Sequence, residues 1–207
     1  MPQLYIKICG LSTAETVAAA VAAGADAIGF VFAPGSPRTV APDLVATLLA
    51  GIPEHVETVG VFRDQPLAGV LETARRSGVS TVQLHGDEPL GDITAAQAAG
   101  FRTLRAFSAG AYARLDDAAR ALWDNERILL DAIEPGAGVA FDPADVLAAP
   151  PAGQWLLAGG LNPDNVAHLA MVLRPDGVDV SSGVESRRGV KDPELVKAFI
   201  AAARSVR

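Results

Sequence analysis

Residues 16–34 read TVAAAVAAGADAIGFVFAP, an almost continuously apolar stretch that is nearly long enough to span a bilayer. Gly24 and Asp26 divide it into two halves of different character. The first half is rich in alanine and follows a capping box formed by Ser12 and Glu15, which is typical of a helix start. The second half is β-branched and aromatic, as buried strands are. The stretch therefore predicts a helix, a turn and a buried strand rather than a membrane span.

The same helix-then-strand unit recurs along the chain. Apolar strand candidates occur at residues 4–9, 27–32, 56–62, 79–84, 102–107, 127–131, 154–158 and 177–181. Near-continuous apolar strands that are covered by helices favour an all-parallel sheet. Eight such units, in about the shortest length typical of the fold, predict an α/β protein with a single (β/α)₈ TIM barrel and one domain over residues 1–207.

Start and stop signals set the direction of several helices between these strands. Pro66 is predicted to occupy the first position of one helix, and Gly78 to end it. Asn162 and Asp192 each look like N-caps, because a proline follows each of them directly. These signals agree with helices that alternate with the strand candidates.

Charge and cysteine content limit the possible partners. The formal net charge of −7 and the pI near 4.9 argue against a general nucleic-acid surface, and we expect neither nucleic acid nor membrane as a partner. A single cysteine excludes an internal disulfide framework and a Cys-cluster metal site, and His55, His85 and His168 show no ligand-like spacing. We therefore expect no metal. No secretory signal pattern is present, so the cytoplasm is the expected compartment.

Two groups that can transfer protons stand at strand ends. Cys9 ends the first strand candidate and Asp131 ends the sixth, so the barrel would place them facing one another at its mouth, where active sites of this fold lie. A thiol and a carboxyl can divide acid and base roles when their surroundings separate their pKa values. Proton transfer is therefore the natural reaction type. Taken alone, Cys9 could equally be a small core residue, and Asp131 a strand-end cap.

The loops after the seventh and eighth strand candidates are rich in glycine. AGG at residues 158–160 and SSG at residues 181–183 allow main-chain N–H groups to crowd around an anion. Barrels frequently bind phosphate at these two loops. Glycines also make tight turns, but their position on adjacent strands favours a small phosphate site. Arg38, in a Pro-rich loop, is either a stiffened fork for a carboxylate or phosphate or a solvated charge.

Seven motifs, in order along the whole chain, resemble the phosphoribosylanthranilate isomerase family of tryptophan biosynthesis. They are KICGL (7–11), GFVFAPGSPRTV (29–40), VGVF (59–62), VQLHGDE (82–88), LLDA (129–132), LAGGLNPDNV (157–166) and GVDVSSGVE (177–185), the last followed by GVKD (189–192). Seven matches in order are far more specific than any one of them.

The resemblance implies an Amadori rearrangement of N-(5-phosphoribosyl)anthranilate to 1-(2-carboxyphenylamino)-1-deoxyribulose 5-phosphate, with no metal and no organic cofactor. It implies that Asp131 is the general acid and Cys9 the general base. It further implies binding roles, with Arg38 for the substrate carboxylate, Gly159, Gly160, Ser182 and Gly183 for the phosphate, and His85 and Asp179 as pocket-lining residues. His85 has an equal alternative as a strand-end hydrogen-bonding residue. The implied partner is a phosphosugar, and the protein would be a monomer or a homodimer.

The chain departs from the family pattern at two places. The family usually has a longer Gly-Thr-Gly type loop after the sixth strand, whereas residues 132–143 read AIEPGAGVAFDP. The family often reads SSPG where this chain has Ser186, Arg187, Arg188 and Gly189, and we expect the two arginines to face water.

Three other functions stay open at this point. A histidine-pathway aminoaldose isomerase, or a bifunctional barrel, would be expected to have an aspartate in place of Cys9 and two phosphate sites. A phosphosugar-binding barrel without turnover would not need both proton-transfer residues. A cysteine-nucleophile enzyme would need a partner dyad that the sequence does not offer.

Overall fold

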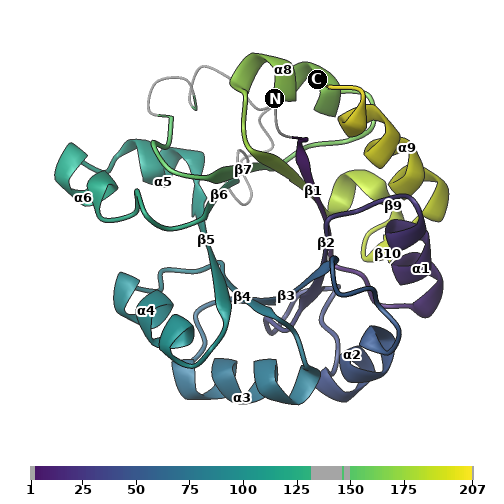
Figure 1. Cartoon of the computed structure of the whole chain (residues 1–207), viewed down its shortest axis with the longest axis horizontal. Helices are drawn as coiled ribbons and strands as arrows, with labels where there is room; N and C mark the ends of the chain where they lie inside the picture. The colour runs from purple at the N-terminus through teal and green to yellow at the C-terminus, as the bar shows by residue number, and fades with distance from the viewer. Residues whose placement is uncertain (1–2, 132–145, 147–149, 207) are drawn as a thin grey trace.

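The computed structural model describes residues 3–131, 146 and 150–206. Eight parallel strands form a closed barrel in which each strand is hydrogen-bonded to its sequence neighbours and β8 closes onto β1. Helices cover the outside of the barrel (Figure 1). The predicted α/β TIM barrel is therefore confirmed, and every strand lies within two residues of its predicted limits.

The elements follow one another in strict order. The barrel strands are β1 (Tyr5–Cys9), β2 (Ala27–Val31), β3 (Glu57–Phe62), β4 (Thr81–Leu84), β5 (Arg102–Ser108), β6 (Ile128–Asp131), β7 (Trp155–Ala158) and β8 (Gly177–Val180). The helices are α1 (Ala14–Ala22), α2 (Pro42–Leu49), α3 (Leu67–Ser77), α4 (Leu90–Ala98), α5 (Ala109–Ala113), α6 (Asp117–Ala121), α8 (Val166–Leu173) and α9 (Pro193–Arg204). A 3₁₀ turn, η1 (Ser182–Val184), and a hairpin of β9 (Glu185–Arg187) and β10 (Val190–Lys191) follow β8. None of the helices described is long and apolar enough to cross a membrane.

Helix starts differ from the predicted ones by a residue or more. Thr13, not Ser12, caps α1, because its hydroxyl lies on extended backbone and accepts the amide hydrogen of Thr16. The predicted capping box is therefore wrong by one residue. Gly78 ends α3 in the left-handed conformation, as predicted, but Pro66 is the N-cap rather than the first helical residue.

The two N-caps predicted from prolines have different outcomes. Asp192 caps α9 by accepting the amide hydrogens of Glu194 and Leu195. Asn162 accepts the amides of Asp164 and Asn165, so it closes the turn that precedes α8 rather than capping the helix itself. Asp192 is confirmed, and the prediction for Asn162 is wrong by one turn.

The apolar core has two layers. The larger layer packs the strands against the helices, with fully buried side chains such as Ile8, Phe30 and Phe199. Inside the barrel, smaller clusters of mostly Ala, Val and Leu side chains line the two halves of the wall. The interior also contains buried charged groups, among them Lys7, Asp179 and Glu57. The strand ends that carry these groups decide where chemistry can take place.

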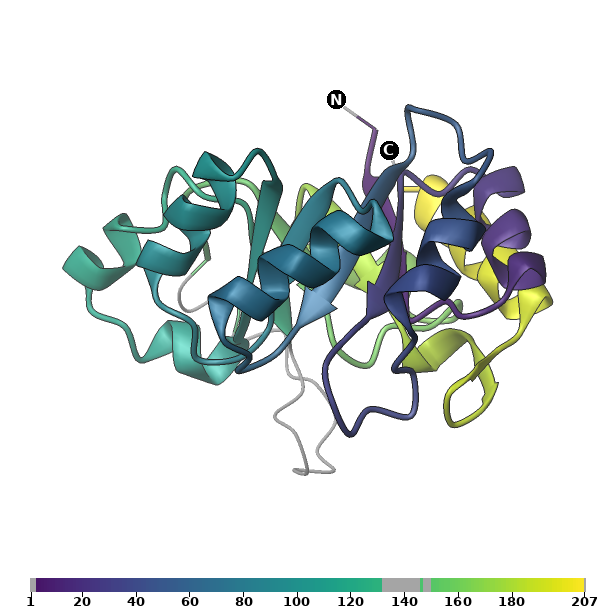
Figure 2. The same ribbon diagram turned by 90° about the horizontal axis from the view of Figure 1, so that it is seen from below.

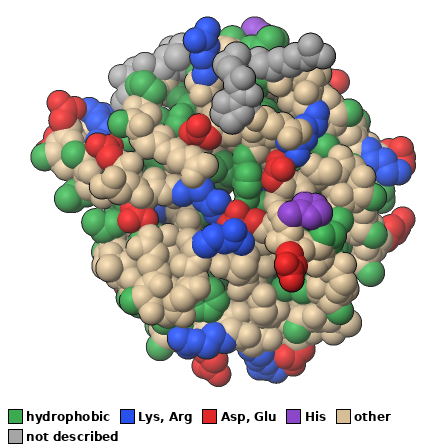
Figure 3. Space-filling view, viewed as in Figure 1, with side chains coloured by type: hydrophobic (Ala, Val, Ile, Leu, Met, Phe, Trp, Pro, Cys, Tyr) green, Lys and Arg blue, Asp and Glu red, His purple; other side chains and the backbone are tan. Residues whose placement is uncertain are grey.

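The two ends of the barrel have different contents. Both chain termini lie at the end opposite to the loops that leave the carboxyl ends of the strands (Figure 2). Acidic and basic side chains lie close together around the centre of the face that Figure 1 presents (Figure 3). At the amino ends of the strands, Glu57 accepts hydrogen bonds from Tyr5 and Thr81 and a two-pronged contact of 2.6 and 2.9 Å from Arg127.

We predict that Glu57→Gln destabilises the protein by roughly 3 kcal/mol at pH 7, because it leaves the Arg127 guanidinium without its counter-charge. Burial alone would raise the pKa of Glu57, but hydrogen bonds and charge from Arg127 hold it at about 2, below its ordinary 4.5. A depressed pKa in the folded state contributes stability that is present above about pH 4.5 and lost as the pH falls toward 2. Denaturant unfolding of the two proteins from pH 7 to pH 2.5 measures this.

The matched control is Glu54→Gln, at an exposed glutamate in the loop before β3. It should leave the free energy of unfolding within about 0.5 kcal/mol of wild type. A pH-independent difference between wild type and Glu57→Gln would contradict the ionic explanation.

Candidate active site

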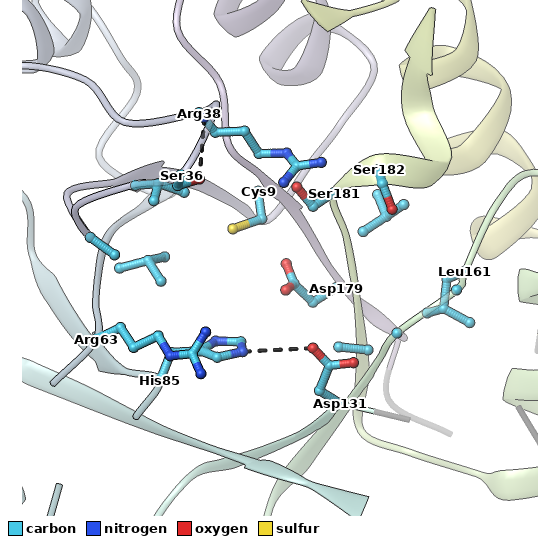
Figure 4. A pocket seen from close by; sticks show the side chains of 17 residues that line it. Cys9, Ser36, Arg38, Arg63, His85, Asp131, Leu161, Asp179, Ser181 and Ser182 are labelled. Carbon is cyan, nitrogen blue, oxygen red and sulfur yellow. Dashed lines mark hydrogen bonds and ion pairs between the residues drawn. The ribbon is translucent and has the colours of Figure 1, made fainter. Parts of the chain in front are cut away.

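A cavity of 380 Å³ opens at the carboxyl ends of the strands. Its wall brings together residues from the ends of β1, β4, β6, β7 and β8 and from the loop after β2 (Figure 4). Of the residues predicted for the site, those that line it are Cys9, Arg38, His85, Asp131, Gly159, Gly160, Asp179 and Ser182. Topology alone explains this gathering, because a closed parallel barrel places all strand ends of one kind at one rim.

Cys9 lies at the base of this cavity, with only 7% of its surface exposed. Its neighbour in β2 is Gly29, and a Cβ at that glycine would lie 3.1 Å from the Cys9 sulfur. Burial raises the pKa of the thiol, and the Asp179 carboxylate raises it further, while Lys7 and Lys191 act in the opposite direction. The resting group at neutral pH is therefore the thiol.

Asp131 ends β6 and also points into the cavity (Figure 4). Its Oδ2 lies 3.6 Å from Nε2 of His85, which follows β4. The Gln83 amide nitrogen lies 2.9 Å from His85 Nδ1, so a donated amide hydrogen leaves the imidazole proton on Nε2, toward Asp131. His85 is thus held from both sides, as a cavity-lining residue and as a strand-end hydrogen-bonding residue.

Arg38 reaches the cavity, but part of its guanidinium is already occupied. Nε and Nη2 donate to the two carboxylate oxygens of Glu185 at 2.6 and 2.9 Å. An arginine has five N–H donors, so this contact leaves the Nη1 edge and one Nη2 hydrogen for a further acceptor. Hydrogen bonds from Arg38, Lys191 and the Gly189 amide outweigh burial and hold the pKa of Glu185 at about 2. Glu185 therefore stays ionised and fixes the arginine.

Lys191 completes this cluster from the β9–β10 hairpin. Its Nζ donates to Glu185 Oε1 at 2.7 Å and to the Ser181 carbonyl at 2.8 Å, and its side chain is almost fully buried. Gly10, with φ of +79°, leaves room for the cluster, because a Cβ there would lie 2.7 Å from Cδ of Arg38. The hairpin thereby joins the loop after β2 to the loop after β8.

The loops after β7 and β8 form one side of the cavity. Gly159 and Gly160 both have positive φ, which glycine adopts without strain, and Ser181 and Ser182 line the wall next to them. Gly183 does not line the cavity; a Cβ there would lie 1.8 Å from the Leu161 carbonyl oxygen. Its packing against the β7 loop explains why this position has no side chain.

Comparisons with known proteins agree with one family. Residues 6–202 match the family described as N-(5'phosphoribosyl)anthranilate (PRA) isomerase. A protein of Geobacter metallireducens named N-(5'-phosphoribosyl)anthranilate isomerase is 42% identical over 204 residues, which is 97% of this chain and 98% of that protein. The chain belongs to the PRA isomerase family. It is accordingly an isomerase, with a place in tryptophan biosynthesis.

Solved structures of the family extend the match to three dimensions. TrpF from Jonesia denitrificans is 46% identical, with a TM-score of 0.86 and 98% of both chains covered. A phosphoribosylanthranilate isomerase in complex with reduced 1-(o-carboxyphenylamino)-1-deoxyribulose 5-phosphate is 35% identical, with a TM-score of 0.83 and coverage of 98% of this chain and 99% of that one.

The two places where this chain departs from the family pattern have different outcomes. Residues 132–143, after β6, lie outside the part of the chain that the structure describes. Arg187 and Arg188 are exposed and do not line the cavity, so the prediction that they face water is confirmed.

Sequence reasoning assigned no role to three charged residues that surround the site, Lys7, Glu185 and Lys191. A signal existed for Lys7, because it stands two positions before Cys9 in an apolar strand and must share its face. Lys191 and Glu185 lie within quoted family motifs, but no local pattern shows that they pair with each other and with Arg38. Among the described residues, no grouping of His, Cys, Asp or Glu is arranged to hold a metal ion.

We predict that Gly183→Ala lowers the free energy of unfolding by about 1–3 kcal/mol, because the added methyl group forces the loops after β7 and β8 apart. Gly69→Ala is the matched control, since Gly69 is exposed in α3 and a Cβ there meets nothing within 4 Å. That control should be stabilised by up to about 1 kcal/mol. Equal stability of the two variants in urea unfolding would show that the loop contact is easily relieved.

Proposed function

We propose that this chain converts N-(5-phosphoribosyl)anthranilate into 1-(2-carboxyphenylamino)-1-deoxyribulose 5-phosphate, with Asp131 as general acid and Cys9 as general base. The observation that carries the proposal is one cavity that contains a thiol, a carboxyl, a fixed arginine and two glycine-containing loops. A family member has been solved with a reduced form of this product. The reaction is a proton rearrangement, which matches the two titratable side chains.

The first step opens the sugar ring. Asp131, in its protonated form, gives its proton to the furanose ring oxygen, and the C1′–oxygen bond breaks to leave a protonated Schiff base at C1′. His85, 3.6 Å from the carboxyl, keeps Asp131 oriented toward the cavity. An acid fixed at a strand end needs no loop movement to reach the ring oxygen.

The second step removes a carbon-bound proton. The cationic Schiff base acidifies the proton on C2′, so a base of moderate strength is adequate. Cys9 takes this proton as the thiolate, and the electron pair of the C–H bond forms the C1′–C2′ double bond of an enolamine. The enolamine then gains a proton at C1′ and loses the proton of its C2′ hydroxyl, which gives the ketone.

Substrate binding divides between two sides of the cavity. The donors of Arg38 that Glu185 leaves open would bind the anthranilate carboxylate. Gly159, Gly160, Ser182 and Gly183 would hold the phosphate, with Gly183 acting through loop packing as well. Asp179 and His85 would line the space between. We propose no metal and no cofactor for this chemistry.

The remaining predictions concern the whole protein. We propose that residues 1–207 form one domain that works in the cytoplasm as a monomer or homodimer; a related isomerase from Thermotoga maritima is dimeric. The direct test of function is incubation of the purified protein with phosphoribosylanthranilate and, in parallel, with the aminoaldose substrate of the histidine pathway. Turnover of the first alone supports the proposal, and turnover of the second alone would replace it.

Cys9→Ser and Asp131→Asn should each lower kcat by at least about 10²-fold, the lower end for loss of general acid–base catalysis. Serine nearly preserves the size of cysteine but is a far poorer base, so a packing role for Cys9 predicts nearly normal turnover instead. Steady-state kinetics measure kcat, and binding of a product analogue checks that each variant keeps its folded site. A normal kcat in either variant would remove that residue from the mechanism.

Arg38→Ala should raise KM strongly with a smaller effect on kcat, because the carboxylate that it binds changes little during the sugar chemistry. Arg38→Lys should restore binding only in part, since a lysine lacks the planar fork. Arg63→Ala provides a control at another arginine that lines the cavity, and it should change KM less. An unchanged KM in Arg38→Ala would place the substrate carboxylate elsewhere.

A further inference from the structure

A lysine is buried under the floor of the active-site cavity. Lys7 has 0% of its surface exposed and does not line the cavity, so it lies out of contact with any substrate there. Lysine is almost never fully buried unless it is paired, and a buried lysine loses much favourable hydration. The proposed proton transfers do not use this group.

The contacts of Lys7 join it to two residues of the site. Its Nζ donates to Asp179 Oδ1 at 2.8 Å, and β1–β8 pairing places the two residues directly opposite each other. The same ammonium hydrogen-bonds the side chain of Cys9. Gly29 makes room for both side chains, because a Cβ there would lie 3.1 Å from the Cys9 sulfur and 3.3 Å from Lys7 Cε.

We propose that Lys7 is a positioning residue for proton abstraction: its ammonium, anchored on Asp179, holds the Cys9 sulfur at the base of the cavity and stabilises the thiolate. This inference rests on the proposed role of Cys9 as the base. It assigns to the lysine a task that no cavity-lining residue performs, which is to supply a fixed positive charge behind the reacting sulfur.

The charges that face Cys9 support Lys7 as the cation that persists. They are Lys7 on the same strand, Asp179 on β8 and Lys191 on β10. Burial alone would lower the pKa of Lys7, but Asp179 and Cys9 outweigh it, so the pKa lies above its ordinary value. Burial lowers the pKa of Lys191, against the attraction of Glu185. As the pH rises toward the range where a thiol ionises, Lys7 is therefore the ammonium that stays charged.

A purely structural role makes a different prediction. If Lys7 only neutralises Asp179, its removal changes stability but leaves the titration of Cys9 where it was. Because Cys9 is the only cysteine in the chain, the ultraviolet absorbance of the thiolate reports this one group, with Cys9→Ser as the baseline.

The test is Lys7→Met, which keeps the length of the side chain and removes the charge. The thiolate titration of Cys9 should move upward by at least about one pH unit, which is about tenfold less thiolate at a fixed pH below the midpoint. The pH dependence of kcat should move in the same direction while KM changes little. Lys197→Met, at an exposed lysine on α9, is the control and should shift neither curve.

A second pair of variants keeps the test valid if Lys7→Met fails to fold, since it leaves Asp179 buried without a partner. Asp179→Asn and the double variant Lys7→Met/Asp179→Asn differ only in the lysine. The double variant should have the higher thiolate midpoint, again by at least about tenfold in thiolate fraction. Equal midpoints within the pair that folds would overturn the role of Lys7.

The outcomes separate this inference from the proposed function. A higher thiolate midpoint with a shifted kcat profile supports both. A higher midpoint with an unchanged kcat profile shows that Lys7 acts on Cys9 while Cys9 is not the base, which overturns the catalytic meaning of the contact. A normal kcat in Cys9→Ser would identify the same fault independently of Lys7.

Discussion

The ion pair between Lys7 and Asp179 is the interaction on which the barrel and its site both depend. It lies where β8 closes onto β1, so the last strand of the barrel is joined to the first by a buried charge pair as well as by main-chain hydrogen bonds. Burying two charges is costly unless they meet in good geometry, and only the closed register gives the 2.8 Å contact. The pair therefore ties a correctly closed barrel to a correctly placed Cys9, two residues further along β1.

A second charged cluster depends on this closure. The hairpin after β8 carries Glu185 and Lys191 to the loop after β2, where Glu185 holds Arg38. Two cations share one carboxylate in this cluster, so it retains a net positive charge next to a cavity in a protein that is acidic overall. An anionic substrate would restore the balance of charge on binding. Local charge rather than total charge thus decides what this chain can attract.

The sequence predicts local features better than it predicts pairs. Apolar runs bounded by glycine and proline place every strand, because burial on both faces leaves a continuous signal. Cys9 and Asp131 are predictable because strand ends of one kind meet at one rim. The Lys7–Asp179 and Arg38–Glu185 pairs join residues 172 and 147 positions apart, and only the closed register brings them together. Cap positions fail by a residue because Ser12 and Thr13 offer the same hydroxyl, and backbone geometry chooses between them.

The environment of Cys9 balances two requirements of a base. Burial raises the pKa of the thiol, which makes its thiolate a stronger base but leaves less of it at neutral pH. Proton abstraction from carbon gains from the first effect and loses from the second, so the best pKa lies near the working pH. Two ammonium groups on one side and a carboxylate on the other set that pKa without touching the substrate. A strand that carries both the base and a buried lysine can therefore tune its chemistry from inside the barrel, while the loops at the rim remain responsible for binding.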